Sequence, residues 1–197
     1  MKKTSGKSTR GKRQSNSRSG QPRKRTGQEN GENQENDLQK LFVDELADIY
    51  NAEQQLTKAL PKLAKAAESD VLRQAFEDHL EETTEQLSRL DEVFRALGES
   101  PKRKTCKGMQ GLIEEGKEVM EEHEGTEAVD AALIACEQKV EHYEIASYGT
   151  LCAWAERMGN SEALDLLKEN MEEEEATDEK LTQLAESLAN ERAEQSA

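Results

Sequence analysis

The fold is decided by residues 37–98, which read DLQKLFVDELADIYNAEQQLTKALPKLAKAAESDVLRQAFEDHLEETTEQLSRLDEVFRALG. Two stripes recur there at three- and four-residue steps, as on one face of an α-helix: Leu38, Phe42, Leu46, Ile49, Leu56, Leu60 and Leu63, then Leu72, Phe76, Leu80, Thr83, Leu87, Leu90 and Phe94. Because the turn between them is short (66–70), the two helices should pack antiparallel as a hairpin. Pro61 is expected to kink or break the first helix, Asp70 to cap the second, and Gly98 to end it.

A second hairpin follows after a long connection. Residues 99–126 hold Pro101, Gly108 and Gly111, and the apolar set Leu112, Ile113, Val119 and Met120 predicts a short helix within them. A third long helix, 127–158, should be capped by Thr126 and ended by Gly159, and a fourth should run from Ser161 to the low 190s. Two hairpins joined by one long crossover form the ferritin-like arrangement, so the sequence predicts an all-α four-helix bundle.

The charge divides the chain in two. Of its 197 residues, the first 28 carry ten cations and no anion, and no apolar residue lies between Lys2 and Asp37. Such a segment cannot offset its ordering entropy, so 1–37 is predicted to be a disordered basic tail. It is either a solubility tail or an arm that binds nucleic acid without sequence specificity, because it has no aromatic side chain to stack on bases. Residues 38–197 hold 17 cations and 38 anions, a net charge of −21, and form the predicted bundle domain.

Several classes of protein are disfavoured by composition. A run of about 18 apolar residues does not occur, so we expect no membrane span. The positive N-terminus is not followed by an apolar stretch, unlike a secretory signal. The cysteines Cys106, Cys136 and Cys152 are odd in number and form no C-x-x-C pair, which argues against a disulfide framework and favours a cytoplasmic location.

Several acidic residues lie on the apolar faces of the predicted helices. Glu53 falls between Ile49 and Leu56, Glu144 between Val140 and Ser147, and Glu174 three residues past Met171. Unpaired buried carboxylates are costly, so acids on every helix need a common explanation. A dinuclear site of iron or manganese is one explanation. Its candidate ligands by position on the helices are Glu53, His79, Glu82, Glu144, Glu174 and Asp178.

The alternative is a bundle whose inner acids pair with other polar groups or with water. Lys139, Tyr50, Tyr143 and Tyr148 could provide such partners. The Glu-x-x-His pair typical of di-iron bundles is absent, and His79-x-x-Glu82 stands in its place, followed by Gln86. Any metal site would therefore be poor in histidine.

Four long motifs in order resemble the YciF-like family of bacterial proteins. They are DELADIYNAEQQLTKALPKLAKAA (44–67), AFEDHLEETTEQLSRL (75–90), KVEHYEIASYGTL (139–151) and EEEEATDEKLTQLA (172–185). The resemblance covers about residues 38–190 and implies a ferritin-like fold, related to rubrerythrins, in proteins associated with bacterial stress responses. Rubrerythrin-like ligand roles would then fall to Glu53, to Glu82 with His79 or Gln86, to Glu141 and Glu144, and to Glu174 with Asp178.

Three hypotheses follow for function. The first is a stress-response protein with a dinuclear iron or manganese centre that handles peroxide or ferrous iron. The second is a metal-free structural or interaction protein, and the third binds DNA through residues 1–37. The apolar residues of the crossover also predict a homodimer, because one bundle surface has limited room to bury them.

Overall fold

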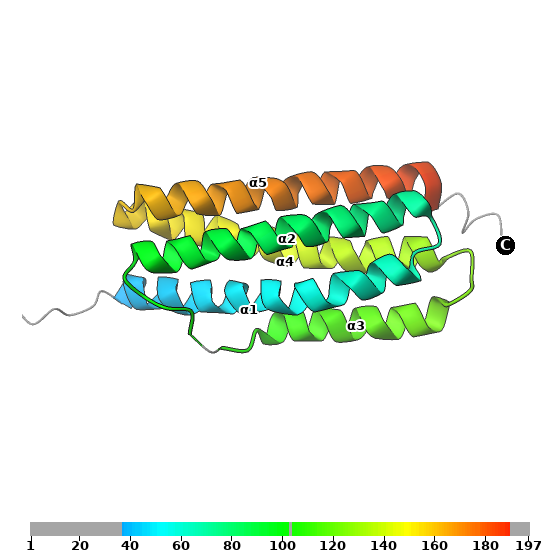
Figure 1. The fold of residues 1–197 in the computed structure, drawn as a ribbon, viewed down its shortest axis with the longest axis horizontal. Coiled ribbons are helices and arrows are strands. Elements are labelled where there is room, and N and C mark those ends of the chain that lie inside the picture. The colour runs from blue at the N-terminus through cyan, green and yellow to red at the C-terminus, as the bar shows by residue number, and fades with distance from the viewer. Residues whose placement is uncertain (1–36, 103, 190–197) are drawn as a thin grey trace, which may run out of the picture. The chain divides into compact units, whose positions relative to one another are not determined.

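The computed structural model describes residues 37–102 and 104–189, and these form helices and connecting turns without a strand (Figure 1). The elements are α1 (Asp37–Ala66), α2 (Asp70–Ala96), α3 (Lys107–His123), α4 (Val129–Met158) and α5 (Ser161–Leu184), with one π-helical turn at Ala185–Ala189. Helices α1 and α2 form one hairpin and α4 and α5 the other, so the predicted four-helix bundle with a long crossover is confirmed. The predicted basic tail lies outside the described residues, except for Asp37.

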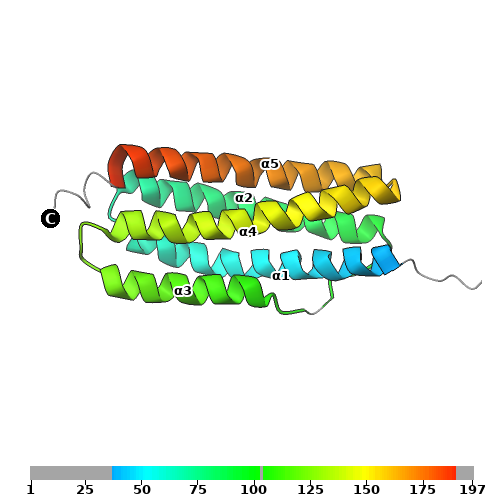
Figure 2. The same cartoon turned by 180° about the vertical axis from the view of Figure 1, so that it is seen from behind.

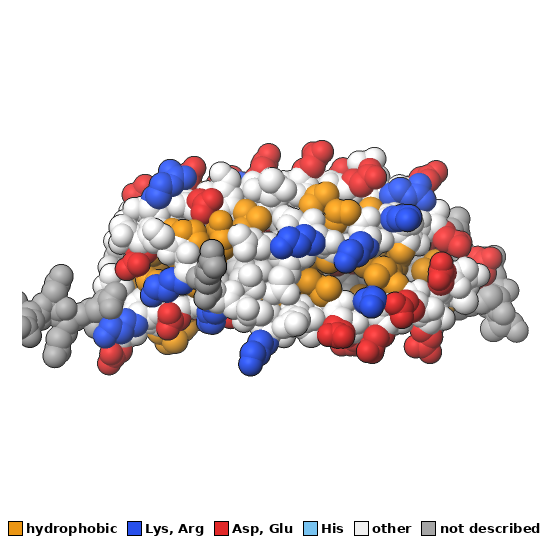
Figure 3. Space-filling model, turned by 60° about the horizontal axis from the view of Figure 1, so that its bottom comes forward, with side chains coloured by type: hydrophobic (Ala, Val, Ile, Leu, Met, Phe, Trp, Pro, Cys, Tyr) orange, Lys and Arg blue, Asp and Glu red, His pale blue; other side chains and the backbone are white. Residues whose placement is uncertain are grey.

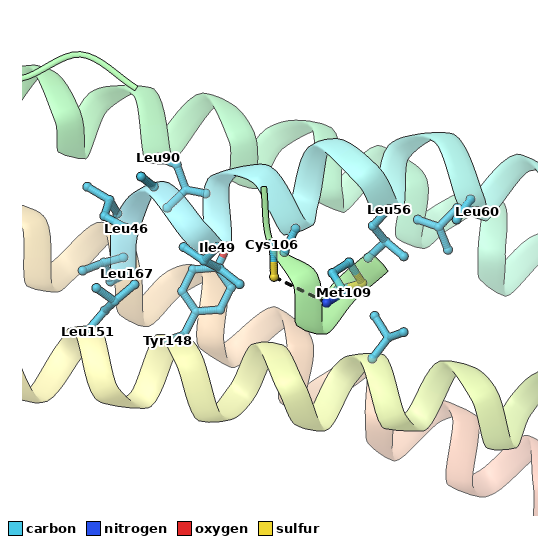
Figure 4. Packing of buried hydrophobic residues seen from close by; sticks show 14 of the residues in the cluster. Leu46, Ile49, Leu56, Leu60, Leu90, Cys106, Met109, Tyr148, Leu151 and Leu167 are labelled. Atoms are coloured by element: carbon cyan, nitrogen blue, oxygen red, sulfur yellow. Dashed lines mark hydrogen bonds between the residues drawn. The ribbon is translucent and has the colours of Figure 1, made fainter. Parts of the chain in front are cut away.

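The extra helix of the crossover lies against α1 and α4, as the two opposite views agree (Figure 2). Its start is fixed by Cys106, whose backbone N–H donates to Asn51 Oδ1 (2.8 Å) and whose thiol accepts from Met109 N (3.4 Å). Both Cys106 and Met109 are fully buried beside Ile49, Leu56 and other core residues (Figure 4). The start of the crossover helix is therefore part of the core, and all three cysteines are buried free thiols.

Two predicted helix starts are wrong. Ser69, not Asp70, caps α2: its hydroxyl accepts from Leu72 N (3.5 Å), whereas Asp70 is exposed and pairs with Arg73. Helix α4 begins after Ala128 without a side-chain cap, and Thr126 instead donates to the carbonyl of His123. Neighbouring Ser, Thr and Asp residues compete for the same backbone groups, so the choice depends on how the turn folds.

Two of the predicted helix ends are confirmed. Gly98 and Gly159 follow α2 and α4 with φ of 70° and 71°, the left-handed conformation that glycine adopts without strain. Helix α1, however, continues past Pro61 to Ala66 without a break. Proline removes one helical hydrogen bond, but Leu63 and Ala64 beyond it are buried, and this packing holds the last turn in place. Within the described ranges, every helix is too short or too polar to cross a membrane.

Candidate metal centre

Acidic side chains from three helices and one histidine meet inside the bundle. They are buried because each continues an apolar stripe: Glu53 on α1, His79 on α2, Glu137, Glu141 and Glu144 on α4, and Glu174 on α5. The three acids of α4 are spaced by four and three residues, so they line one face of that helix. Each side chain is at most 1% exposed.

Four of these side chains can offer one atom each to a common centre. Ligand atoms from His79, Glu141, Glu144 and Glu174 all lie within 4.8 Å of one another. His79 is held on both sides of its ring: Nδ1 lies 3.1 Å from Glu137 Oε1 and 3.4 Å from Glu141 Oε1, and Nε2 lies 3.5 Å from Glu174 Oε2. One imidazole is therefore surrounded by carboxylates from two other helices.

Most polar atoms of this cluster have no hydrogen-bond partner among the described residues. Both carboxylate oxygens of Glu141, Glu144 and Glu174 lack one, as does Nε2 of His79. Buried polar groups in folded proteins are nearly always paired, and each buried unpaired group costs about 1–3 kcal/mol, more when charged. Such a concentration of unpaired atoms needs protons or a cation to be stable.

The pKa values of the cluster reflect the same shortage of hydrogen-bond donors. Burial raises the pKa of Glu141 and of Glu144, and neighbouring carboxylates raise the latter further. Burial and the charge of Glu174 raise the pKa of Glu53 to about 8, although Tyr148, His79 and Glu144 lower it in part. Burial alone would lower the pKa of His79, but Glu141, Glu137 and Glu174 raise it well above its usual value. Without a metal, the folded cluster thus holds protons that these acids lose in water.

Glu53 differs from the other acids because one of its oxygens is hydrogen-bonded. The hydroxyl of Tyr148, itself fully buried, donates to Glu53 Oε1 and accepts from Asn170 Nδ2 (3.0 Å). Asn170 Oδ1 in turn accepts from Arg89 Nε (2.5 Å). This series of hydrogen bonds fixes the orientation of Glu53, whose other oxygen, Oε2, has no hydrogen-bond partner among the described residues.

Five of the seven ligands predicted from the sequence lie in or beside this cluster, and two do not. Glu82 is half-buried, and its Oε2 accepts from the hydroxyl of Thr177 (3.3 Å). Asp178 lies 3.3 Å from both Gln138 Nε2 and His142 Nε2. Helix α2 turns His79 and Gln86 fully inward, so Glu82 lies at the edge of the buried face. The amide of Gln86 is fully buried.

Sequence reasoning missed Glu137. Its position four residues before Glu141 and seven before Glu144 places it on the same face of α4, and this spacing was the available signal. Glu137 contacts Nδ1 of His79, on the side of the ring away from Nε2. A carboxylate in this position commonly orients a histidine that binds a metal through its other nitrogen.

The donor set fits a hard or intermediate divalent cation. Carboxylate oxygens with one imidazole nitrogen suit iron and manganese better than copper or zinc, and no thiol takes part. The fold and this cluster define the class of protein: a ferritin-like four-helix bundle with a buried carboxylate–imidazole centre between its two hairpins.

Comparison with known proteins gives the family. The chain belongs to the family described as a domain of unknown function (DUF892), which matches residues 37–194. It is 53% identical over 161 residues to Protein YciF of Escherichia coli (strain K12), covering 81% of this chain and 97% of that one.

Solved structures agree with this assignment. The crystal structure of the E. coli stress protein YciF matches with a TM-score of 0.74 and 53% identity, over 77% of this chain and 96% of that one. A protein from Rhodopseudomonas palustris called YcfI matches with a TM-score of 0.72 and 46% identity, over 74% and 92% of the two chains. The resemblance to YciF-like proteins expected from the motifs is thus confirmed.

Proposed function

We propose that the buried cluster is a dinuclear iron or manganese centre and that the protein acts in bacterial stress protection by handling peroxide or ferrous iron. The observation that carries the proposal is the set of unpartnered ligand atoms on His79, Glu141, Glu144 and Glu174, gathered within 4.8 Å. A bundle that used acids only for stability would have surrounded them with donors. The E. coli relative is described as a stress protein, which supports the physiological setting.

The residues have distinct roles in this proposal. Glu141 and Glu144 on α4, Glu174 on α5 and Glu53 on α1 would supply carboxylate oxygens, which can bridge two ions. His79 would supply Nε2, because its Nδ1–H donates to Glu137 and so fixes the tautomer. Tyr148 would keep Glu53 oriented through its hydroxyl.

Two bound ions of iron or manganese would supply one-electron redox chemistry beside these carboxylates. The protein's own contribution would be to exclude water and to hold protons. Raised pKa values of Glu53, Glu141 and Glu144 allow these carboxyls to keep a proton until a cation replaces it. If the activity is the oxidation of ferrous iron, that ion would be the substrate as well as the metal that the centre binds.

Elemental analysis of the full chain, purified without chelators, tests the proposal directly. We expect about two ions of iron or manganese per chain in the wild type and a large loss in Glu144→Gln. The matched control is Glu175→Gln, since Glu175 is exposed and its neighbour Glu174 belongs to the cluster. This control should bind metal like the wild type.

Thermal unfolding gives a second readout that does not depend on activity. Ferrous or manganous ions should raise the melting temperature of the metal-stripped wild type and of Glu175→Gln, because a ligand that binds only the folded state stabilises it. Glu144→Gln should respond far less. Wild-type protein that retains neither metal and is not stabilised by either ion would refute the centre and favour a metal-free protein.

A further inference from the structure

A second candidate site is an apolar pocket between α1, α3 and α4. Its volume is about 270 Å³, and its walls include Leu56 and Leu63 of α1, Ile113 and Met120 of α3, and Val140 of α4. Figure 3 shows hydrophobic side chains gathered on this face of the bundle, with Lys and Arg side chains among them. The crossover helix thus leaves part of its apolar face open as a concave pocket instead of filling it.

Charged side chains of α1 and α3 also line the pocket. They are two cations, Lys62 and Lys117, and one anion, Glu121. Lys58, Lys62 and Lys65 follow each other on one exposed face of α1, and none of them has an ion-pair partner within the described ranges. Lys117 lies 3.6 Å from Glu121, but both side chains are about 70% exposed, and such pairs contribute little. Lys62 is thus a local cation without an ion-pair partner among the described residues, and it can attract the charged group of an anionic ligand although the domain as a whole is acidic.

The inner wall of the pocket is Glu137, which contacts the candidate metal centre through its hydrogen bond to His79 (3.1 Å). Glu137 is only 1% exposed and turns its carboxylate toward the histidine. A molecule in the pocket would therefore lie one side chain away from the cluster.

We propose that this pocket binds a small anionic amphiphile, namely a carboxylate with a short unbranched apolar chain. The chain would pack among Leu56, Ile113 and Val140, and the carboxylate would lie at the rim beside Lys62 and Lys117. The pocket volume of about 270 Å³ lies just below the range of about 300–1,000 Å³ for small-molecule sites, which favours a short chain. This inference does not rest on a bound metal, because none of the candidate ligands His79, Glu141, Glu144 and Glu174 lines the pocket.

The binding of hexanoate, octanoate and decanoate to the full chain tests the inference, with calorimetry on metal-stripped and metal-loaded protein. Each added methylene that is buried should tighten binding about fourfold until the pocket is full. Decanoate should also displace the anionic fluorophore 1-anilinonaphthalene-8-sulfonate. Because metal content is measured separately, the two proposals can fail independently.

A pocket-filling variant and its control come from the same helix. Gly116 lines the pocket, and a Cβ at this position would lie 3.8 Å from Cys136 Cβ, an ordinary contact. Gly116→Leu should weaken decanoate binding at least about tenfold. Gly111 has open space around it, so Gly111→Leu should bind decanoate like the wild type.

A second pair of variants tests recognition of the charge even if Gly116→Leu folds poorly. The double substitution Lys62→Gln and Lys117→Gln should weaken decanoate about fivefold or more and leave uncharged 1-decanol unaffected. Lys168→Gln on the exposed face of α5 is the control and should change neither.

Three results would overturn the inference. The first is no decanoate binding at 1 mM, roughly the weak limit of specific affinity. The second is an equal affinity for decanoate in the wild type and in a folded Gly116→Leu variant. The third is a dimer in light scattering that Gly116→Leu converts to a monomer without any binding of decanoate, because a second copy of the chain would then be the occupant.

Discussion

Two buried carboxylate regions of the bundle are built on opposite principles. Asp130, near the start of α4, is 4% exposed, and its two oxygens accept hydrogen bonds from the backbone N–H groups of Glu68 (2.9 Å) and Ser69 (3.0 Å). It thereby ties the turn of the α1–α2 hairpin to the other hairpin. Glu144, farther along the same helix, is fully buried among other acids, and within the described ranges no N–H or hydroxyl group donates a hydrogen bond to its oxygens.

The difference separates a structural acid from a candidate functional one. Two donors offset the loss of solvation at Asp130, so this carboxylate stabilises the fold as it stands. At Glu144 burial is not offset by any donor, and the neighbouring acids add repulsion. Substitution should therefore have opposite effects on stability at the two sites, and the predictions below test this contrast in order of expected size.

The largest effect concerns the pH dependence of metal-stripped protein. The pKa of Glu53 is raised to about 8 from 4.5 in unfolded chains, so the folded state binds the additional proton between these values. Stability from such a group is present below the unfolded pKa and lost as pH rises through the folded one. The free energy of unfolding should fall by about 1.4 kcal/mol per pH unit for each such proton, or about 4 kcal/mol between pH 5 and 8. Urea unfolding at several pH values measures it.

Surface charge is the main confounder of this measurement. Repulsion among exposed acids also weakens at lower pH, but salt screens exposed charges much more than buried ones. We expect the slope to persist in 0.5 M NaCl, an ionic strength at which the Debye length is only about 4–5 Å. A flat profile at high salt, or stability that rises from pH 5 to 8, would contradict the account of the cluster.

The second prediction concerns the structural acid. Asp130→Ala leaves the N–H groups of Glu68 and Ser69 without their acceptors and should lower the free energy of unfolding by about 3 kcal/mol at pH 7. Asp165→Ala, an exposed acid on α5, is the control and should stay within about 0.5 kcal/mol of the wild type. A loss below 1 kcal/mol, roughly the contribution of one neutral hydrogen bond, would mean that Asp130 does not hold the turn.

The third prediction concerns the functional candidate. Glu144→Gln keeps the size of the side chain and replaces an acid that the folded protein must either bury as a charge or protonate. In metal-stripped protein at pH 8 it should raise the free energy of unfolding by about 1–2 kcal/mol, because uncompensated buried charges destabilise a fold. Glu175→Gln should have almost no effect. Clear destabilisation by Glu144→Gln without metal would show that this acid is a structural group like Asp130.

The sequence predicted these two regions unequally. The inward direction of Glu53, Glu144 and Glu174 follows from the 100° turn per residue of a helix, because each lies at the centre of an apolar stripe. The direction of residues at the edge of an apolar stripe was harder to predict. His79 and Glu82 flank the stripe of α2 on similar terms, and only the packing of α2 against the other hairpin turns His79 inward and leaves Glu82 half-buried.

Contacts across long sequence separations could not be predicted at all. Asp130 binds backbone groups 61 and 62 residues away, and nothing local in the sequence marks it as a partner of that turn. The same holds for the cap of α2, since Ser69 and Asp70 are both good N-caps and the tertiary structure of the turn decides between them. The kink or break predicted at Pro61 was wrong for the same reason, because tertiary packing overrides the low helix propensity of proline.

The smallest change in stability is expected where polar side chains are hydrogen-bonded to one another and are also accessible to water. Tyr143 OH donates to Asp48 Oδ2 (2.8 Å) and lies 2.9 Å from Cys106 Sγ, while Lys104 Nζ lies 3.2 Å from Asp48 Oδ1. Burial alone would raise the pKa of Asp48, but hydrogen bonds from Cys106, Tyr143 and Lys104 lower it below its usual value. Because the Asp48 side chain is 16% exposed, water can replace a lost donor there.

Tyr143→Phe should therefore cost only about 1 kcal/mol in urea unfolding at pH 7, compared with about 3 kcal/mol for Asp130→Ala. A double-mutant cycle with Asp48→Ala, which removes the acceptor, isolates the bond and should give a coupling free energy near 1 kcal/mol. If water access is what separates the two regions, this coupling stays small although the bond is as short as those of Asp130. A coupling of about 3 kcal/mol, the size expected for a bond to a fully desolvated charge, would show that pairing alone sets the cost and that exposure does not.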